Sequence, residues 1–284
     1  MEDPILITLG RDFFLVSAAA RGFFDPLMIE RQYWAGRGEI FGSSEGRGTA
    51  LFVGKSRRMV LRHYFRGGMM SKISRDKFLF LGNAESSRAF KEFRMLEKLI
   101  DLGIDVPAPV AARVRLAGAR RYTCDLLTMY AEGAEDLAKI GKSRNLTIAE
   151  LEDIGIAIGK LIKHGVYHSD LNVRNIMVDS SGKIWVIDFD KCGFTRGKGK
   201  EMLSRLGRSF AKERSLCGDK TSLCEEDFAR IKEVCMKYVG NGGKSLVSEI
   251  CESLDHPDAD CCSQENPPAS IKCPEDDVQD VSRE

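Results

Sequence analysis

A polar segment in the second half of the chain contains residues that could carry out phosphoryl transfer. It runs from His168 to Asn175 with the sequence HSDLNVRN, and Asp188 follows Asn175 by thirteen residues. Transfer of a γ-phosphoryl group from ATP needs oxygen ligands for metal ions and a carboxylate that orients the attacking hydroxyl. We therefore predict that Asp170 is the catalytic base and that Asn175 and Asp188 bind Mg²⁺. We interpret His168 as an architectural residue of the same loop, since HxDxxxxN followed by DFx is a kinase pattern.

A glycine-rich stretch lies earlier in the chain, just before a strand-like segment that begins at Thr49. It contains Gly42, Gly46 and Gly48 in the sequence GSSEGRG. Backbone N–H groups of such a loop could close over the phosphates of ATP, and Gly46 and Gly48 are our candidate contacts. The stretch departs from the GxGxxG pattern, however, and an ordinary surface loop is the alternative interpretation.

The ion pair that anchors ATP phosphates in kinases has an unusual candidate here. Glu92 occupies the middle of a predicted helix, where the partner of a strand lysine is expected. The strand position itself is Arg62, and the nearby lysines are Lys55 and Lys72. An arginine can hold phosphate through its fork of donors, but its reach differs from that of lysine. We predict that Arg62 and Glu92 contribute to the nucleotide site, with Lys72 as an alternative to Arg62 and a solvated helix face as the alternative for Glu92.

Hydrophobic periodicity predicts the elements that must position these residues. Alternating segments on either side of turn residues indicate β-hairpins, and apolar residues at three- and four-residue spacing indicate helices. A capping box at Thr147 and Glu150 marks one helix start, and Gly165 is suited to its left-handed C-terminal cap. The predicted elements are hairpin strands at 49–53 and 59–64, a helix over 89–100, strands at 110–116 and 122–129, a helix from 148 to 162, short strands at 176–178 and 184–187, and helix after 198.

Length and composition limit the class of protein. The chain has 284 residues, 43% hydrophobic and 30% charged, with 8 prolines, which excludes disordered, collagenous and coiled-coil chains. We expect an N-terminal lobe over 1–130, a C-terminal lobe over 131–245, and an acidic tail over 246–284 that is disordered. The nine cysteines form no CxxC pair, so reduced thiols are expected rather than a disulfide framework or a zinc site.

Charge is unevenly distributed along the chain. Residues 252–284 hold ten acidic and two basic side chains, a net charge of −8, which leaves residues 1–251 at +9. A positive body suits an anionic partner such as phosphate, a membrane surface or nucleic acid, without choosing among them. The longest early apolar run, Phe13 to Ala20, is too short for a bilayer span or a signal peptide. We therefore expect a protein of the cytosol or of a membrane surface.

Five stretches of the chain resemble the 3-deoxy-D-manno-octulosonic acid (Kdo) kinases of Gram-negative bacteria, which belong to the lipopolysaccharide kinase family. RHYFRGG after Leu61 and IDFD at residues 187–190 carry most of the specificity. The resemblance extends over residues 30–215 and leaves the cysteine-rich acidic tail unmatched. The stretches are His168–Cys192, Leu61–Lys72, Glu92–Leu99, Val106–Val114 and Leu203–Glu213.

The resemblance implies an α+β, protein-kinase-like bilobal fold with a mainly antiparallel β N-lobe and a mainly helical C-lobe. It implies ATP- and Mg²⁺-dependent phosphorylation of the 4-hydroxyl of Kdo on a lipid A precursor. Such an enzyme works as a peripheral protein on the cytoplasmic face of the inner membrane; no nucleic acid and no protein partner is expected. Asp170, Asn175 and Asp188 match the catalytic and metal positions. Asp190 stands where many protein kinases have glycine, which argues against an ordinary protein kinase.

Other functions remain open from the sequence alone. Arg62, His63, Arg66 and Lys72 form a basic cluster around two glycines, which could bind an anion or could simply be a solvated strand end. The acceptor could be a lipopolysaccharide heptose, an aminoglycoside or a protein side chain. The irregular glycine loop and Arg62 also allow a nucleotide-binding module without catalysis. Nucleic-acid binding is weaker still, because no motif combines the basic residues with exposed aromatics.

Overall fold

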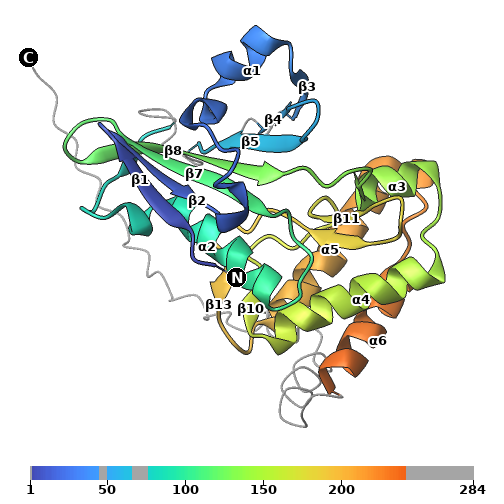
Figure 1. The fold of residues 1–284 in the computed structure, drawn as a ribbon. Helices are drawn as coiled ribbons and strands as arrows, with labels where there is room; N and C mark the ends of the chain where they lie inside the picture. The colour runs from blue at the N-terminus through green and yellow to red at the C-terminus, as the bar shows by residue number, and fades with distance from the viewer. Residues whose placement is uncertain (1, 45–49, 66–75, 241–284) are drawn as a thin grey trace, which may run out of the picture.

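An antiparallel sheet occupies the first half of the chain and helices dominate the second half (Figure 1). The computed structural model describes residues 2–44, 50–65 and 76–240. The predicted α+β kinase-like class is confirmed, whereas the boundaries of the two lobes and of the tail stay predictions. The predicted disorder of the tail concerns residues outside the described ones.

The sheet has eight strands in the order β1-β2-β7-β8-β5-β4-β3, with β6 paired to β8 beyond the end of β5. All of its neighbouring strands are antiparallel. The predicted hairpins at 49–64 and 110–129 are confirmed as β4–β5 and β7–β8. The strands are β1 (Ile5–Leu9), β2 (Asp12–Val16), β3 (Ile40–Ser44), β4 (Ala50–Val53), β5 (Met59–His63), β6 (Phe78–Leu79), β7 (Pro109–Leu116) and β8 (Arg121–Met129).

Helix α2 (Arg88–Asp101) covers one face of this sheet (Figure 1). It begins where predicted, because the Ser87 hydroxyl accepts a hydrogen bond from the Phe90 N–H at 3.3 Å. Its apolar residues pack against the inward side chains of β7 and β8 in one continuous core. Glu92 belongs to this buried face, so the alternative of a solvated position for Glu92 is wrong.

The first 37 residues, for which the sequence pattern predicted no element, add the hairpin β1–β2 and helix α1 (Arg31–Arg37). Strand β2 pairs with β7, and α1 packs on the opposite face of the sheet from α2. A chain of ion pairs supports this attachment. It comprises His63–Asp125 (2.7 Å), Arg113–Asp125 (2.8 Å), Arg113–Glu30, Arg115–Glu30 (2.9 Å) and Arg115–Asp12 (2.7 Å).

Between residues 135 and 240 the described chain forms four helices and three short strand pairs. Among the described residues, 3-10 turns occur at η1 (Ala18–Ala20), η2 (Pro26–Ile29), η4 (Ala84–Ser86) and η5 (Gly218–Lys220). The helices are α3 (Leu137–Ser143), α4 (Ile148–Lys163), α5 (Gly199–Cys217) and α6 (Glu225–Gly240). The strands are β9 (Glu135–Asp136), β10 (Val166–Tyr167), β11 (Ile176–Val178), β12 (Ile184–Val186) and β13 (Gly193–Phe194), paired as β9–β11, β11–β12 and β10–β13.

Helix α4 leads the chain directly to the polar segment. The capping box at Thr147 and Glu150 is confirmed at its start, and Gly165 follows its end in the left-handed conformation with φ +68°. Gly155 and Gly159 let α6 approach closely, since a Cβ at either position would lie under 3.0 Å from α6 atoms. The close packing explains two glycines inside a helix that they would otherwise destabilise.

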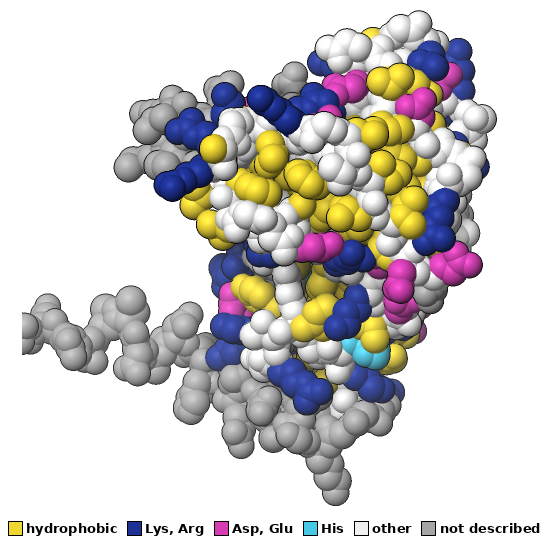
Figure 2. Space-filling view, turned by 60° about the vertical axis from the view of Figure 1, so that its left-hand side comes forward, with side chains coloured by type: hydrophobic (Ala, Val, Ile, Leu, Met, Phe, Trp, Pro, Cys, Tyr) yellow, Lys and Arg dark blue, Asp and Glu magenta, His cyan; other side chains and the backbone are white. Residues whose placement is uncertain are grey.

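The five cysteines within residues 2–44, 50–65 and 76–240 are free thiols, as expected for those positions. None of the helices in the same ranges is both long and apolar enough to traverse a bilayer. On the face shown in Figure 2, Lys and Arg side chains are interspersed with Asp and Glu, and hydrophobic side chains gather in the upper part.

Candidate active site

The polar segment connects two short strands, β10 and β11. His168 is fully buried at its start and its imidazole contacts the ring of Phe189 edge-on, with 4.8 Å between ring centroids. Its Nδ1 accepts the N–H of Asp170 at 3.2 Å, so the proton lies on Nε2, which donates to the Ile187 carbonyl at 3.0 Å. Burial lowers the pKa of His168. A neutral, architectural histidine therefore connects Asp170 to the segment after β12 that contains Asp188.

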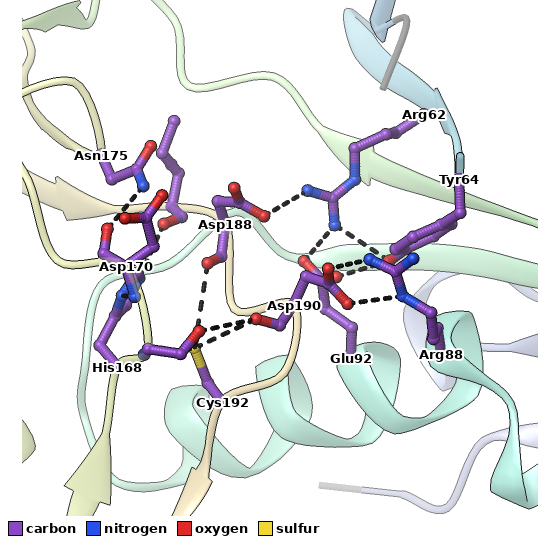
Figure 3. A network of polar contacts seen from close by, with 12 residues as sticks. Arg62, Tyr64, Arg88, Glu92, His168, Asp170, Asn175, Asp188, Asp190 and Cys192 are labelled. Carbon is purple, nitrogen blue, oxygen red and sulfur yellow. Dashed lines mark hydrogen bonds and ion pairs between the residues drawn. The ribbon is translucent and has the colours of Figure 1, made fainter. Parts of the chain in front are cut away.

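Asn175 fastens the other end of the loop. Its Nδ2 donates to the Asp170 carbonyl at 2.9 Å, and its own carbonyl accepts the N–H of Ile187 at 3.0 Å. Because the amide nitrogen is used in this way, the amide oxygen has no hydrogen-bond partner among the described residues. The oxygen is thus the free end of the side chain, on the side of the loop that faces Asp188 (Figure 3).

Asp188 lies between the polar loop and the sheet (Figure 3). Its backbone has φ +65°, a conformation that non-glycine residues seldom adopt and that is common at functional sites. Its Oδ1 accepts a hydrogen bond from Arg62 at 2.8 Å, and its side chain is 41% exposed. The second carboxylate oxygen is therefore available to a ligand.

Arg62 connects the sheet to both α2 and Asp188. Strand periodicity places Arg62 and Tyr64 on the same face of the chain, toward α2. Arg62 forms an ion pair with Glu92 and donates to the Tyr64 hydroxyl at 2.9 Å, while that hydroxyl donates to Glu92 at 2.6 Å. One guanidinium therefore links the strand, the helix and Asp188, the candidate metal ligand.

Burial strongly affects the titration of this cluster. It would lower the pKa of Arg62, but the negative charges of Glu92 and Asp188 outweigh it and the net pKa lies well above its usual value. Burial also raises the pKa of Tyr64 well above 10.0, so the phenol stays protonated and donates to Glu92. Arg62 therefore stays protonated and positively charged beside the carboxylates of Glu92 and Asp188.

Asp190 makes the next link in the chain of contacts. Its two carboxylate oxygens accept from Arg88, one of them at 3.0 Å from Nε. Its backbone carbonyl accepts from the hydroxyl of Ser169 at 3.1 Å. The sulfur of Cys192 accepts the Ser169 N–H at 3.3 Å, and burial raises the pKa of this thiol to about 12. The loop that contains Asp170 and the segment that contains Asp188 are thereby linked to each other and to α2 (Figure 3).

Five of the seven predicted site residues meet in this one region. They are Asp170, Asn175, Asp188, Arg62 and Glu92, which come from the polar loop, the segment after β12, β5 and α2. Gly46 and Gly48 lie outside the described residues, as does Lys72, the alternative phosphate anchor. Their roles stay predictions.

Sequence reasoning missed Tyr64, Arg88 and Arg205 as members of the site. Tyr64 and Arg88 complete the contacts of Glu92 and Asp190, and Arg205 of α5 lies 4.0 Å from the Asp170 carboxylate. Strand alternation from Arg62 points to Tyr64. Arg88 could have been found because it is the first residue of the helix that carries Glu92. The only sequence signal for Arg205 is that it lies four residues from Glu201 and from Ser209 along α5. This signal can be used only once it is known which face of the helix meets the polar loop.

The oxygen atoms at Asn175 and Asp188 are suited to Mg²⁺. This ion is commonly held by one or two protein carboxylates together with substrate phosphates. Within the described ranges no group of three histidine, cysteine or acidic side chains could hold a metal ion by protein ligands alone. The amide oxygen of Asn175 and the second oxygen of Asp188 fit a metal that the nucleotide helps to hold.

Sequence comparisons identify relatives along most of the chain. The lipopolysaccharide kinase (Kdo/WaaP) family matches residues 31–234. A 3-deoxy-D-manno-octulosonic acid kinase of Vibrio vulnificus is 40% identical over 202 residues, which are 70% of this chain and 83% of the relative. The Vibrio cholerae protein of the same name is 40% identical over 185 residues, covering 64% of this chain and 78% of the relative.

A solved structure also resembles the chain. It is titled "WaaP in complex with acyl carrier protein" and has a TM-score of 0.50 at 14% sequence identity. The match covers 85% of this chain and 98% of that one. At this identity the likeness concerns the fold alone, and it agrees with the antiparallel sheet followed by helices.

Proposed function

Since the chain belongs to the lipopolysaccharide kinase (Kdo/WaaP) family, we propose that it transfers the γ-phosphoryl group of ATP to the 4-hydroxyl of Kdo on a lipid A precursor. Such a reaction belongs to lipopolysaccharide core biosynthesis. The observation that carries the proposal is the convergence of Asp170, Asn175 and Asp188 beside the Arg62–Glu92 ion pair. The relatives named Kdo kinases supply the acceptor.

Asp170 acts as the catalytic base in this proposal. Its side chain is 61% exposed, so an acceptor hydroxyl can reach it. The backbone on both sides is held, because the Asp170 N–H is bonded to His168 and its carbonyl to Asn175. A base held in this way can orient the attacking hydroxyl and accept its proton as the phosphoryl group is transferred.

Asn175 and Asp188 would hold Mg²⁺, which would neutralise negative charge on the nucleotide phosphates. Arg62 keeps Asp188 in place through its 2.8 Å hydrogen bond and keeps its own position through Glu92 and Tyr64. Gly46 and Gly48 are proposed to cover the phosphates from the sheet side. These assignments rest on the kinase pattern together with the contacts described above.

The proposed place of action is the cytoplasmic face of the inner membrane, with the chain bound peripherally. The body of the chain carries a net charge of +9, which favours approach to anionic lipid headgroups and to a phosphorylated lipid acceptor. The proposal includes neither a nucleic acid nor a protein partner.

A direct assay tests the proposed reaction. The full chain is incubated with Mg²⁺, labelled ATP and a Kdo-bearing lipid A precursor, and the phosphorylated position is determined in the product. Label on the Kdo 4-hydroxyl is expected from the unchanged protein. Asp170→Ala is expected to lose about 10²–10⁴-fold in rate while retaining ATP binding and melting temperature.

The control for this assay is Asp153→Ala, which removes an exposed carboxylate from α4. It is expected to leave the rate unchanged. An unchanged chain that binds ATP but does not label the Kdo lipid would contradict the proposed acceptor. Full activity in Asp170→Ala would contradict the assignment of the base.

A further inference from the structure

Helix α5 presents one face to the polar loop that contains Asp170. Residues four apart lie one above another on a helix, so a regular four-residue series marks a single stripe. The stripe begins in the first turn of the helix and continues for three turns. It consists of Glu201, Arg205, Ser209 and Glu213.

Three members of this stripe are firmly bonded to the loop or to the strand before it. The second bond lies two helical turns beyond the first and the third lies one turn beyond the second, so the loop is aligned along the helix. The bonded pairs are Glu201 with the Tyr167 hydroxyl, the Ser209 hydroxyl with the Val173 N–H at 3.1 Å, and Glu213 with Arg174 at 3.0 Å.

Arg205 is the exception, and it lies at the level of Asp170. Its Nη1 is 4.0 Å from the Asp170 Oδ1 and its Nη2 is 3.8 Å from Glu201, both longer than a hydrogen bond. In the part of the chain that the structure describes, its Nε is buried and has no hydrogen-bond partner. A guanidinium has five donors, and leaving a buried donor unpaired is costly. The side chain is 35% exposed, so a ligand can reach its outer nitrogens.

The position of Arg205 indicates what it could bind. A guanidinium matches carboxylates and phosphates through two parallel N–H donors. Arg62 and Arg88 already hold Asp188 and Asp190 through hydrogen bonds of 2.8 and 3.0 Å. Arg205 also interacts with the Tyr167 hydroxyl, but its contacts with carboxylates are long, 3.8 Å to Glu201 and 4.0 Å to Asp170. It adjoins the candidate base, where the acceptor hydroxyl must lie.

We infer that Arg205 binds the carboxylate of the acceptor sugar and thereby places the reacting hydroxyl on Asp170. The inference rests on the proposed function, whose acceptor is a sugar acid, and it adds the residue that selects this class of acceptor. Arg205 also offsets repulsion between an anionic acceptor and the carboxylates of Asp170 and Asp188. A neutral sugar would leave the guanidinium without its partner and would be a poorer acceptor.

The test compares two acceptors and three variants of the full chain. The acceptors are the Kdo-bearing lipid A precursor and the same lipid with the Kdo carboxylate converted to its carboxamide. The variants are Arg205→Met, Arg205→Lys and the matched control Arg208→Met. Arg208 is exposed one turn further along α5, where it bonds only to Ser204 among the described residues.

Arg205→Met is expected to lower kcat/KM for the acid by roughly 10- to 100-fold, mainly through KM for the acceptor. On the carboxamide it should change kcat/KM by less than about twofold, since the partner of the guanidinium is already absent. Arg205→Lys should fall between, because the charge remains but the fork is lost. Arg208→Met should match the unchanged protein on both acceptors.

The possible results separate this inference from the proposed function. An equal loss on acid and carboxamide would overturn the inference, because Arg205 would then act on the nucleotide or on Asp170. An unchanged rate for Arg205→Met on the acid would overturn it as well. If Arg205→Met does not fold, Arg205→Lys decides by the same comparison. An unchanged protein inactive on both lipids would overturn the proposed function, and the inference with it.

Discussion

Arg88, the first residue of α2, donates hydrogen bonds to both carboxylate oxygens of Asp190. It thereby contacts the loop that carries Asp188. The same guanidinium donates to the Phe65 carbonyl at 3.2 Å, just after β5. Both partners are mostly buried, with side chains 23% and 19% exposed. Asp190 stands where many protein kinases have glycine. Its contact with Arg88 links the loop that carries Asp188 to the sheet and to α2.

We predict that the Arg88–Asp190 pair positions Asp188. Arg88→Met and Asp190→Asn should each lower kcat and raise the Mg²⁺ concentration needed for half-maximal rate, because the loop at φ +65° loses its support. A double-mutant cycle on the free energy of unfolding should show a coupling of about 0.5–3 kcal/mol. Urea unfolding and Mg²⁺ titrations of activity measure both quantities.

The matched control for this pair is Arg94→Met, also on α2. Arg94 contacts Glu85 at 3.0 Å, but the two side chains are 43% and 45% exposed. Such a surface pair contributes about 0–1 kcal/mol, so this variant should retain its Mg²⁺ dependence. Equal effects of Arg88→Met and Arg94→Met would contradict a positioning role.

Arg62 is predicted to have separable roles in stability and activity. Arg62→Met leaves the carboxylate of Glu92 buried, 3% exposed, without its cation, at a cost of about 3–5 kcal/mol in unfolding free energy. The double variant Arg62→Met/Glu92→Gln should recover most of that stability. It should not recover the rate, because Asp188 still lacks the donor at 2.8 Å. Recovery of both by the double variant would show that Arg62 is only structural.

Asp188→Asn should mainly impair the use of Mg²⁺. The amide can still accept from Arg62, so the fold should persist, but one anionic metal ligand is lost. We expect the activity at fixed Mg²⁺ to fall by at least about 100-fold, and the half-saturating Mg²⁺ concentration to rise. Metal-free ATP binding, measured by calorimetry, should change little. A Mg²⁺ dependence identical to that of the unchanged protein would remove Asp188 from the metal site.

His63 should make stability depend on pH. Its hydrogen bond to Asp125 raises its pKa above 6.5, against burial, which lowers it; Asp76 adds to the rise and Arg113 opposes it. A raised pKa means that the folded protein binds the proton more tightly than the unfolded chain. The stabilisation is therefore complete below pH 6.5 and is lost as the pH rises through the folded-state pKa.

The comparison of unchanged protein with His63→Gln measures this effect. The difference in unfolding free energy between the two should be largest near pH 6 and should shrink toward pH 9. Urea unfolding at several pH values determines it. A difference that stays constant across this range would show that the Asp125 contact does not favour the protonated imidazole.

Several local features could be predicted because their causes are local. The side chains of Ser87 and Thr147 accept hydrogen bonds from backbone N–H groups only three residues away, so the starts of α2 and α4 can be predicted from the sequence. Strand alternation and turn residues likewise predicted the hairpins β4–β5, β7–β8 and β11–β12. The order HxDxxxxN then DF identified the polar loop, since a loop between two short strands uses contiguous residues.

Other features depend on contacts between distant parts of the chain. The hairpin and α1 of the first 37 residues depend on distant contacts, because β2 pairs with β7 and ion pairs such as Arg115–Asp12 hold the two together. Whether Glu92 faced solvent or the core also depended on which face of α2 meets the sheet.

Spacing and capping act over a few residues, so the residues that could transfer phosphate, and most of the elements that carry them, could be predicted from the sequence. The partners of these residues depend on tertiary contacts. Arg62 meets Asp188 across 126 positions and Arg88 meets Asp190 across 102, distances over which no local periodicity applies. Arg205 approaches Asp170 only because α5 returns along the polar loop. Packing of the hydrophobic core brings these charges together, and the core is a property of the whole chain.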